Sequence, residues 1–161
     1  MLLKPENTIK IIATDFDGIL TDGCVYYSSH SHEELKKISF KDIMGISLAV
    51  KNGYRVAIIS GEKNQIIDKI AGKFSLEDVH QGIRDKLAVL HAICEKYSVP
   101  PENICYLGDD VNDIAVLERV GFAVTVPDAH CKVKKLEGIN ITDACGGNGA
   151  FREVIDFLLD N

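Results

Sequence analysis

The stretch "IIATDFDGILTDG", residues 11–23, leads an apolar segment directly into the aspartates Asp15, Asp17 and Asp22. A short apolar run followed by a polar, glycine-containing loop is typical of a buried parallel strand and the turn after it. Ligands of open α/β sheets bind in the crevice outside the carboxyl ends of the strands. We therefore expect Asp15 to end a strand and Asp17 to lie just beyond it, in a ligand-binding loop.

The rest of the chain repeats this pattern. Short β-branched runs alternate with longer segments of helical period, which favours an α/β domain with a mostly parallel sheet flanked by helices. Strands are expected at 9–15, 54–60, 103–109 and 122–126, with shorter ones at 79–82 and 139–142. Helices are expected from Asp42, as the N-cap, to Asn52, from Glu62 to Phe74, and over 85–97. With 161 residues, the chain is expected to form a single domain over residues 1–161.

Two segments depart from the alternation of strands and helices. In residues 24–40 the arms "CVYYS" and "LKKISF" flank a polar centre, which indicates a β-hairpin flap after the first strand. Residues 145–161 join a glycine-rich tail to a final helix. Neither segment has the length of a second domain.

Composition and charge exclude several classes of function. The formal net charge of −6 argues against a broad surface for nucleic acid or anionic membranes, because both need clustered lysine and arginine. The five cysteines are scattered and form no C-x-x-C pair, which favours a reduced environment. No apolar run approaches the roughly 18 residues of a membrane span, and the first residues lack the apolar core of a signal peptide. We therefore expect a cytoplasmic protein.

Further polar side chains fall at the other strand ends, namely Ser60, Lys86 and Asp109. Carboxylates from two strands suit Mg²⁺, which usually takes one or two carboxylates together with a substrate phosphate. Asp15 would then attack phosphorus, and Asp17, whose pKa a nearby carboxylate would raise, would act as acid and base. Ser60 and Lys86 would hold the phosphoryl oxygens, where charge spreads in the transition state.

Four motifs, "DFDGILTDG", "IISG", "RDKL" and "GDDVND", appear in this order along the chain. In them the sequence resembles the haloacid dehalogenase superfamily of phosphatases, and the resemblance implies a Rossmann-like fold and a Mg²⁺ cofactor. It implies catalytic residues Asp15, Asp17, Ser60 and Lys86, metal ligands Asp15, Asp17 (through its backbone carbonyl) and Asp109, supporting residues Asp110 and Asp113, and substrate-binding residues Gly18, Gly61, Glu62, Lys73, Asn112 and Arg152.

The spacing of the motifs leaves no room for a cap domain. The chain is therefore similar to the capless branch, the 3-deoxy-manno-octulosonate 8-phosphate phosphatases and their relatives that act on nine-carbon sialic-type acids. In that branch four chains assemble with their hairpins packed together, and the tail of one chain closes a neighbour's site. The tail "CGGNGAFREVIDFLL" is similar to the family's, which implies a homotetramer in which Gly146, Gly147, Gly149 and Arg152 act in trans.

One departure from the family pattern bears on the substrate, a phosphorylated 2-keto-3-deoxy sugar acid hydrolysed through an aspartyl-phosphate. Members that act on the eight-carbon acid usually carry two arginines where this chain has Glu62 and Ile70. The loss of two arginines that can clamp an anion is not a conservative change. Glu62 and Lys73 resemble relatives that dephosphorylate ketodeoxynononate (KDN) or N-acetylneuraminate 9-phosphate. A nine-carbon substrate is therefore favoured over 3-deoxy-D-manno-octulosonate (KDO) 8-phosphate.

Two other classes of function fit the residues less well. A phospho-accepting receiver domain also gathers aspartates, a hydroxyl and a lysine at strand ends, but its acceptor aspartate follows the third strand, whereas the comparable strand here ends in Ser60. A non-catalytic oligomerisation module, related to sialic-acid-activating enzymes, would be free to lose its nucleophile. This chain keeps Asp15 and Asp17, so a Mg²⁺-dependent phosphatase is the leading hypothesis.

Overall fold

A six-stranded, entirely parallel sheet forms the centre of the molecule. The computed structural model describes residues 2–28, 30 and 34–160. The strands of this sheet are β1 (Ile11–Thr14), β4 (Arg55–Ile59), β5 (Asp78–His80), β6 (Ile104–Leu107), β7 (Phe122–Thr125) and β8 (Asn140–Ile141). Their order is β5-β4-β1-β6-β7-β8, with Ile11 of β1 paired to Arg55 on one side and Ile104 on the other. The predicted α/β class is confirmed.

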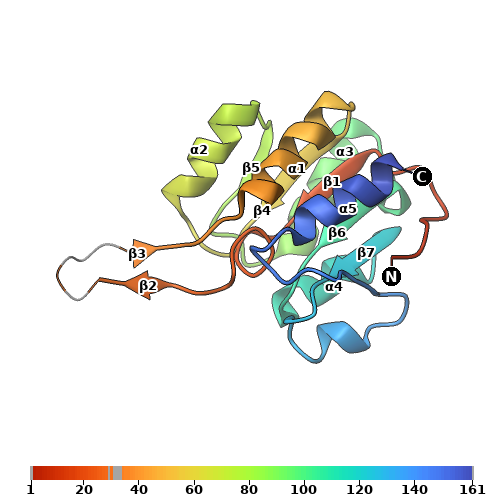
Figure 1. Cartoon of the computed structure of the whole chain (residues 1–161). Coiled ribbons are helices and arrows are strands. Elements are labelled where there is room, and N and C mark those ends of the chain that lie inside the picture. Colours follow the sequence, from red (N-terminus) through yellow and green to blue (C-terminus); the bar gives the residue numbers. More distant parts are fainter. Residues whose placement is uncertain (1, 29, 31–33, 161) are drawn as a thin grey trace.

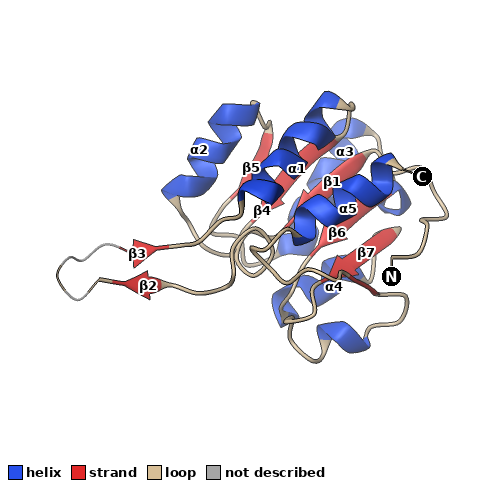
Figure 2. Ribbon diagram, viewed as in Figure 1, coloured by secondary structure: helices blue, strands red, loops and turns tan. Residues whose placement is uncertain are grey.

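Helices cover both faces of the sheet (Figure 1, Figure 2). They are α1 (Phe40–Lys51), α2 (Gln65–Phe74), α3 (Lys86–Tyr97), α4 (Ile114–Leu117) and α5 (Ala150–Leu159), with 3₁₀ turns at Pro101–Asn103, Val111–Asp113 and Val133–Lys135. Helices α1, α2 and α5 supply one buried cluster, and α3 and α4 supply the other. Within β1, Ile12 joins the first cluster, whereas Ile11 and Ala13 join the second, because successive side chains of a strand point to opposite faces.

Two helices begin at residues other than those expected. Helix α1 starts after Ser39, whose hydroxyl accepts a hydrogen bond of 3.1 Å from the Lys41 N–H. Asp42, expected to be the N-cap, instead lies fully buried in the first turn. Helix α2 starts after Asn64 rather than at Glu62. The Asn64 side chain caps it by accepting a hydrogen bond of 2.9 Å from the N–H of Ile66, the second residue of the helix.

The segment between β1 and α1 forms the expected hairpin flap. Strand β2 (Tyr26–Tyr27) pairs antiparallel with β3 (Glu34–Leu35), and Figure 2 shows this hairpin projecting away from the sheet. Residues 29 and 31–33 of the predicted flap lie outside the described residues. Among the residues that are described, no cap domain interrupts the fold. In the same part of the chain, no helix is both long and apolar enough to cross a membrane.

Candidate active site

The carboxyl ends of β1, β4 and β6 open into one depression of about 260 Å³. Parallel strands end at the same edge of a sheet, so the loops that follow them converge there. The residues that line the depression are Asp15, Asp17, Gly18, Gly23, Ser60, Gly61, Glu62, Asp109, Asp110 and Asn112. Most of the site residues expected from the sequence are therefore brought together, and we call this depression the active-site pocket.

Asp15 lies at the buried end of this pocket, directly after β1. Its backbone N–H donates to the Leu107 carbonyl at 2.9 Å, which continues the sheet pairing by one residue. One carboxylate oxygen, Oδ1, accepts the Phe16 N–H at 2.6 Å, and Oδ2 lies 2.7 Å from Lys86 Nζ. Burial, and then the nearby Asp113 carboxylate, raise the pKa of Asp15 to about 7, while Lys86 opposes the rise.

Lys86 is the first residue of α3, and its side chain is completely buried. Its ammonium lies 2.7 Å from Asp15 Oδ2 and 2.8 Å from Asp113 Oδ1. Burial opposes the charge, but the two carboxylates outweigh burial and hold the pKa of Lys86 above its usual range. Lys86 is therefore a fixed positive charge beside the expected nucleophile.

Asp113 is held by a full set of donors. Its Oδ1 accepts from Lys86 and, at 2.6 Å, from the Tyr106 hydroxyl, while Oδ2 accepts the backbone N–H groups of Asp109 and Asp110 at 3.1 and 3.2 Å. Both oxygens are thus engaged, and the residue is fully buried. This arrangement suits Asp113 to positioning Lys86 and the loop after β6, in line with the supporting role expected for it.

Asp15, Asp109 and Asp113 each offer an oxygen within 4.8 Å of the others. Each Asp113 oxygen already accepts two hydrogen bonds, whereas each Asp15 oxygen has one partner, so Asp15 and Asp109 are the side chains suited to hold a cation. Burial, and then the charges of Asp15 and Asp113, raise the pKa of Asp109 to about 7. Three carboxylates face one ammonium here, so a divalent cation bound by oxygen atoms fits the charge and the donors.

Gly18 allows Asp109 to reach this position. The glycine has φ +80°, and a Cβ atom added to it would lie 2.1 Å from Asp109 Oδ2. A side chain at position 18 would therefore displace the carboxylate as well as strain the backbone. The expected contribution of Gly18 to the site has a steric basis.

Asp17 lies at the rim of the pocket, where it meets a residue of the flap. Lys36 Nζ is 2.7 Å from both Asp17 oxygens, and the Thr21 hydroxyl donates to Oδ1 at 3.2 Å. The side chain of Lys36 is 8% exposed. Sequence reasoning missed Lys36, because nothing in its surroundings distinguishes it from its neighbour Lys37.

Ser60, Gly61, Glu62 and Asn112 also line the pocket. Ser60 is buried, and its hydroxyl accepts the Glu62 N–H at 3.2 Å. Asp110 is exposed, and its carboxylate accepts the N–H of Val111 at 2.7 Å, as the cap of the 3₁₀ turn that carries Asp113.

Lys73 is not in the site, contrary to expectation. Helix α2 starts near the pocket and runs back toward the amino end of β5, and Lys73 lies in its last turn, about 12 Å of helical rise from the start. Its ammonium lies 5.2 Å from the centre of the Phe74 ring instead. Lys73 therefore does not line its own chain's pocket, and its expected role in binding substrate stays a prediction.

The glycine-rich segment, whose glycines are expected to act in trans, packs against its own chain, and its role in trans stays a prediction. A Cβ at Gly146 would lie 1.9 Å from the Gly18 carbonyl, and Gly147 donates its N–H to the Ile19 carbonyl at 2.9 Å. The N–H groups of Gly149 and Arg152 donate to Asp42 at 3.0 and 3.1 Å.

The Arg152 side chain is paired within α5, with its Nε 2.7 Å from Asp156 Oδ1. It does not line the pocket of its own chain. Buried Asp42, which sequence reasoning placed only as a cap, instead joins α1 to the start of α5.

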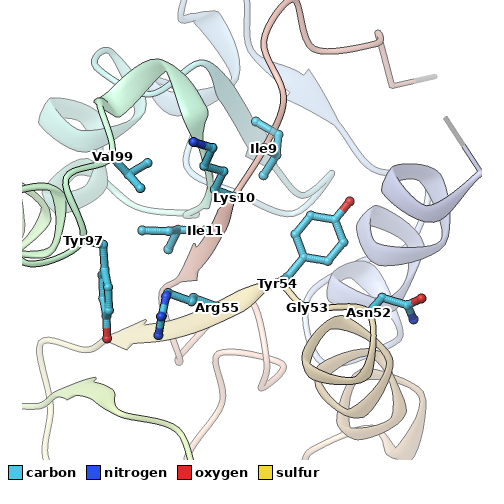
Figure 3. A pocket seen from close by; sticks show the side chains of 9 residues that line it. All are labelled: Ile9, Lys10, Ile11, Asn52, Gly53, Tyr54, Arg55, Tyr97 and Val99. Atoms are coloured by element: carbon cyan, nitrogen blue, oxygen red, sulfur yellow. The ribbon is translucent and has the colours of Figure 1, made fainter.

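A larger cavity, of about 460 Å³, lies at the opposite edge of the sheet (Figure 3). It lies beside the amino ends of β1 and β4, and the Arg55 guanidinium stacks over the Tyr97 ring at 4.1 Å. None of the expected site residues lines it. The chemistry expected from the motifs therefore belongs to the smaller pocket at the carboxyl edge.

Comparison with known proteins bears on the family of this chain. A family model described as haloacid dehalogenase-like hydrolase matches residues 64–144. The 3-deoxy-D-manno-octulosonate 8-phosphate phosphatases KdsC of Salmonella typhi and Escherichia coli (strain K12) are each 37% identical to this chain over 99% of it and 83% of their own length.

Solved structures give the same result. The 3-deoxy-D-manno-octulosonate 8-phosphate phosphatase of Moraxella catarrhalis, in complex with magnesium ion, phosphate ion and KDO, is 33% identical with a TM-score of 0.88, covering 94% of this chain and 86% of that one. A cobalt-bound homologue from Haemophilus influenzae is 29% identical with a TM-score of 0.86, covering 95% and 88%. The chain belongs to the haloacid dehalogenase-like hydrolases.

Proposed function

We propose that this chain is a Mg²⁺-dependent phosphomonoesterase that releases phosphate from a phosphorylated 2-keto-3-deoxy sugar acid through an aspartyl-phosphate. One observation carries the proposal: Asp15, Asp109 and Asp113 converge within 4.8 Å of one another around the buried Lys86 ammonium. A non-catalytic oligomerisation module has no need of this expensive arrangement, because buried charges cost several kcal/mol each unless they are compensated.

Asp15 and Asp109, with the backbone carbonyl of Asp17, are the proposed ligands of Mg²⁺. All three supply oxygen, the ligand that this hard cation prefers. When bound, the cation supplies positive charge that offsets the repulsion between the Asp15 carboxylate and an anionic phosphate. The same charge favours the ionised forms of two carboxyls whose pKa values burial and crowding raise to about 7.

In the first half-reaction, an Asp15 oxygen attacks phosphorus and the bond to the sugar oxygen breaks. Asp17 gives its proton to the departing alkoxide, so the sugar acid leaves as a neutral alcohol at that carbon. Lys86 and the Ser60 hydroxyl hold the other phosphoryl oxygens, on which charge spreads in the transition state. The product on the enzyme is an acyl-phosphate on Asp15.

In the second half-reaction, water attacks the phosphorus of the acyl-phosphate and passes a proton to Asp17. The bond between phosphorus and the Asp15 oxygen breaks, inorganic phosphate leaves, and both aspartates return to their starting states. Because Asp17 gives one proton and takes one back, it must reach both the leaving oxygen and the attacking water. Its position at the rim of the pocket, on the loop after β1, suits both tasks.

KDO 8-phosphate is the first candidate substrate, since relatives that are 37% identical over 99% of the chain are named phosphatases of that compound. A nine-carbon acid, KDN or N-acetylneuraminate 9-phosphate, is the second candidate. Glu62, which replaces an arginine of the eight-carbon pattern, lines the pocket and favours this second candidate. Lys73, the other residue that favoured it, lies away from the pocket, so the case for nine carbons now rests on Glu62.

We further propose that residues 1–161 form one domain and that the protein is cytoplasmic. We also propose that four copies of the chain assemble through their flaps. Large apolar side chains on the flap and the start of α1 support assembly, with Tyr27 73%, Leu35 60% and Phe40 87% exposed. Exposed apolar groups that lie close together commonly mark a protein interface. In such an assembly Arg152 remains a candidate for contact with a neighbouring copy's substrate.

Phosphate release from KDO 8-phosphate and KDN 9-phosphate, measured side by side with Mg²⁺ and with EDTA, tests the proposal. A difference of tenfold or more in kcat/KM, about 1.4 kcal/mol in transition-state binding, identifies the preferred acid. Glu62→Arg is expected to shift the preference toward the eight-carbon substrate. If the folded protein with Mg²⁺ releases phosphate from neither compound, the proposed substrate class is wrong.

A further inference from the structure

Both arms of the flap are tied to the loop after β1. On the outgoing arm, the Tyr26 hydroxyl donates to Asp22 at 2.7 Å. On the return arm, Lys36 Nζ reaches both oxygens of Asp17 at 2.7 Å. Strands β2 and β3 are themselves exposed, so the flap depends on such contacts for its position.

Lys36 is turned inward by the fold. Its side chain is 8% exposed, although it directly follows the exposed strand β3, whereas the next residue, Lys37, is exposed. Ordering a long lysine side chain and removing its ammonium from water both cost free energy. The contact with two carboxylate oxygens offsets this cost, so the burial of Lys36 is tied to Asp17.

We propose that Lys36 is a positioning residue for the base step: it holds the Asp17 carboxylate at the rim of the pocket, so that the flap sets the geometry of proton transfer from the attacking water. The proposal rests on the proposed role of Asp17. Lys36 approaches Asp17 from the flap, while the Thr21 hydroxyl holds the same carboxylate from its own loop at 3.2 Å. A general base must lie within hydrogen-bonding reach of the proton that it takes, so an untethered Asp17 is expected to work less well.

Lys36 acts through Asp17 rather than on the phosphate. Lys36 contacts Asp17 and does not line the pocket, whereas the ammonium that lies beside the nucleophile is that of Lys86, 2.7 Å from Asp15 Oδ2. Loss of Lys36 should therefore slow the chemical steps and leave substrate affinity nearly unchanged. Because the same flap carries the exposed apolar side chains, this contact also connects the surface of the flap to the chemistry of the pocket.

Steady-state kinetics of Lys36→Met, Lys36→Arg and Lys37→Met test the proposal, with Mg²⁺ and either KDO 8-phosphate or p-nitrophenyl phosphate. We expect Lys36→Met to lower kcat by about tenfold to a hundredfold, with KM within about threefold of the wild-type value. Lys36→Arg keeps the charge and two donors, so it should recover to within about threefold of wild-type kcat. Lys37→Met is the matched control on the same arm and should behave as wild type.

Three results would overturn the proposal: a wild-type kcat in Lys36→Met, a rise in KM with unchanged kcat, or an equal loss of kcat in Lys37→Met. If Lys36→Met does not fold, Lys36→Gln takes its place in the same comparison, because glutamine keeps one donor group on a side chain of similar shape. If p-nitrophenyl phosphate is hydrolysed and KDO 8-phosphate is not, the proposed substrate is wrong, but the Lys36 variants can still be compared with p-nitrophenyl phosphate. Release from neither compound would refute the proposed phosphatase itself.

Discussion

In the metal-free protein, replacing Asp109 by asparagine is expected to stabilise the fold above neutral pH. Burial and neighbouring carboxylates raise the pKa of Asp109 from 3.8 to about 7. A carboxyl whose pKa is raised in the folded state costs no stability below its unfolded pKa, and costs progressively more as the pH rises toward its folded pKa. Between pH 5 and pH 7 this cost grows by up to about 2 kcal/mol, and by less to the extent that solvent reaches the group. Asp109→Asn removes it.

Urea unfolding in EDTA at pH 5 and pH 8 measures this effect, with Glu137→Gln as a control for loss of an exposed carboxylate. The free energy of unfolding of the Asp109→Asn protein should rise relative to that of wild type as the pH increases. Saturating Mg²⁺ should remove most of this advantage, because wild type gains about 2.7 kcal/mol at a hundred times its Kd and the variant gains little. A variant that is no more stable than wild type at pH 8 in EDTA, or that gains equally from Mg²⁺, would refute the reasoning.

Two further substitutions test the support of the pocket. Gly18→Ala and its control Gly53→Ala both force alanine to a positive φ, +80° and +86°, which costs about 1–2 kcal/mol of folding stability. Only Gly18→Ala should also weaken Mg²⁺ binding, by about tenfold or more, because it displaces Asp109. Calorimetry measures this affinity. Equal Mg²⁺ affinities in the two variants would contradict this. Tyr106→Phe should lower the free energy of unfolding by about 1.5–3 kcal/mol in urea, since it removes a donor to the buried Asp113 carboxylate; an unchanged unfolding curve would count against that bond.

The fold could be predicted because its signals are local. Each parallel strand is a short apolar run, and the alternation that places Ile12 and Ile11 in opposite clusters is a property of any strand. The residues at the carboxyl ends of those strands, such as Asp15 and Ser60, followed from the topology. Helix starts were harder to predict, because Ser39 and Asp42 are equally good capping residues and only the structure shows which one is buried.

The parts of the site that the sequence did not place depend on the direction of side chains and on contacts between distant segments. Helical period places Lys73 on a face of α2. It does not show that the last turn of this helix, which carries Lys73, lies away from the pocket at the carboxyl edge of the sheet. Lys36 and Lys37 are alike in sequence, and only the approach of the flap to Asp17 separates them. The cis packing of Gly146 on the Gly18 carbonyl likewise joins segments that no local pattern connects.

The most direct test of the account is to trap the phosphorylated enzyme. The Asp17→Asn protein lacks the base that activates water, so acid quenching during reaction with p-nitrophenyl phosphate should leave a phosphoryl group on the peptide that carries Asp15, detectable by mass. Asp15→Asn should carry no phosphoryl group and should lose kcat by about a thousandfold or more while keeping its fold. Phosphate release by Asp15→Asn near the wild-type rate, or a phosphoryl group on a different peptide, would contradict the central role of Asp15.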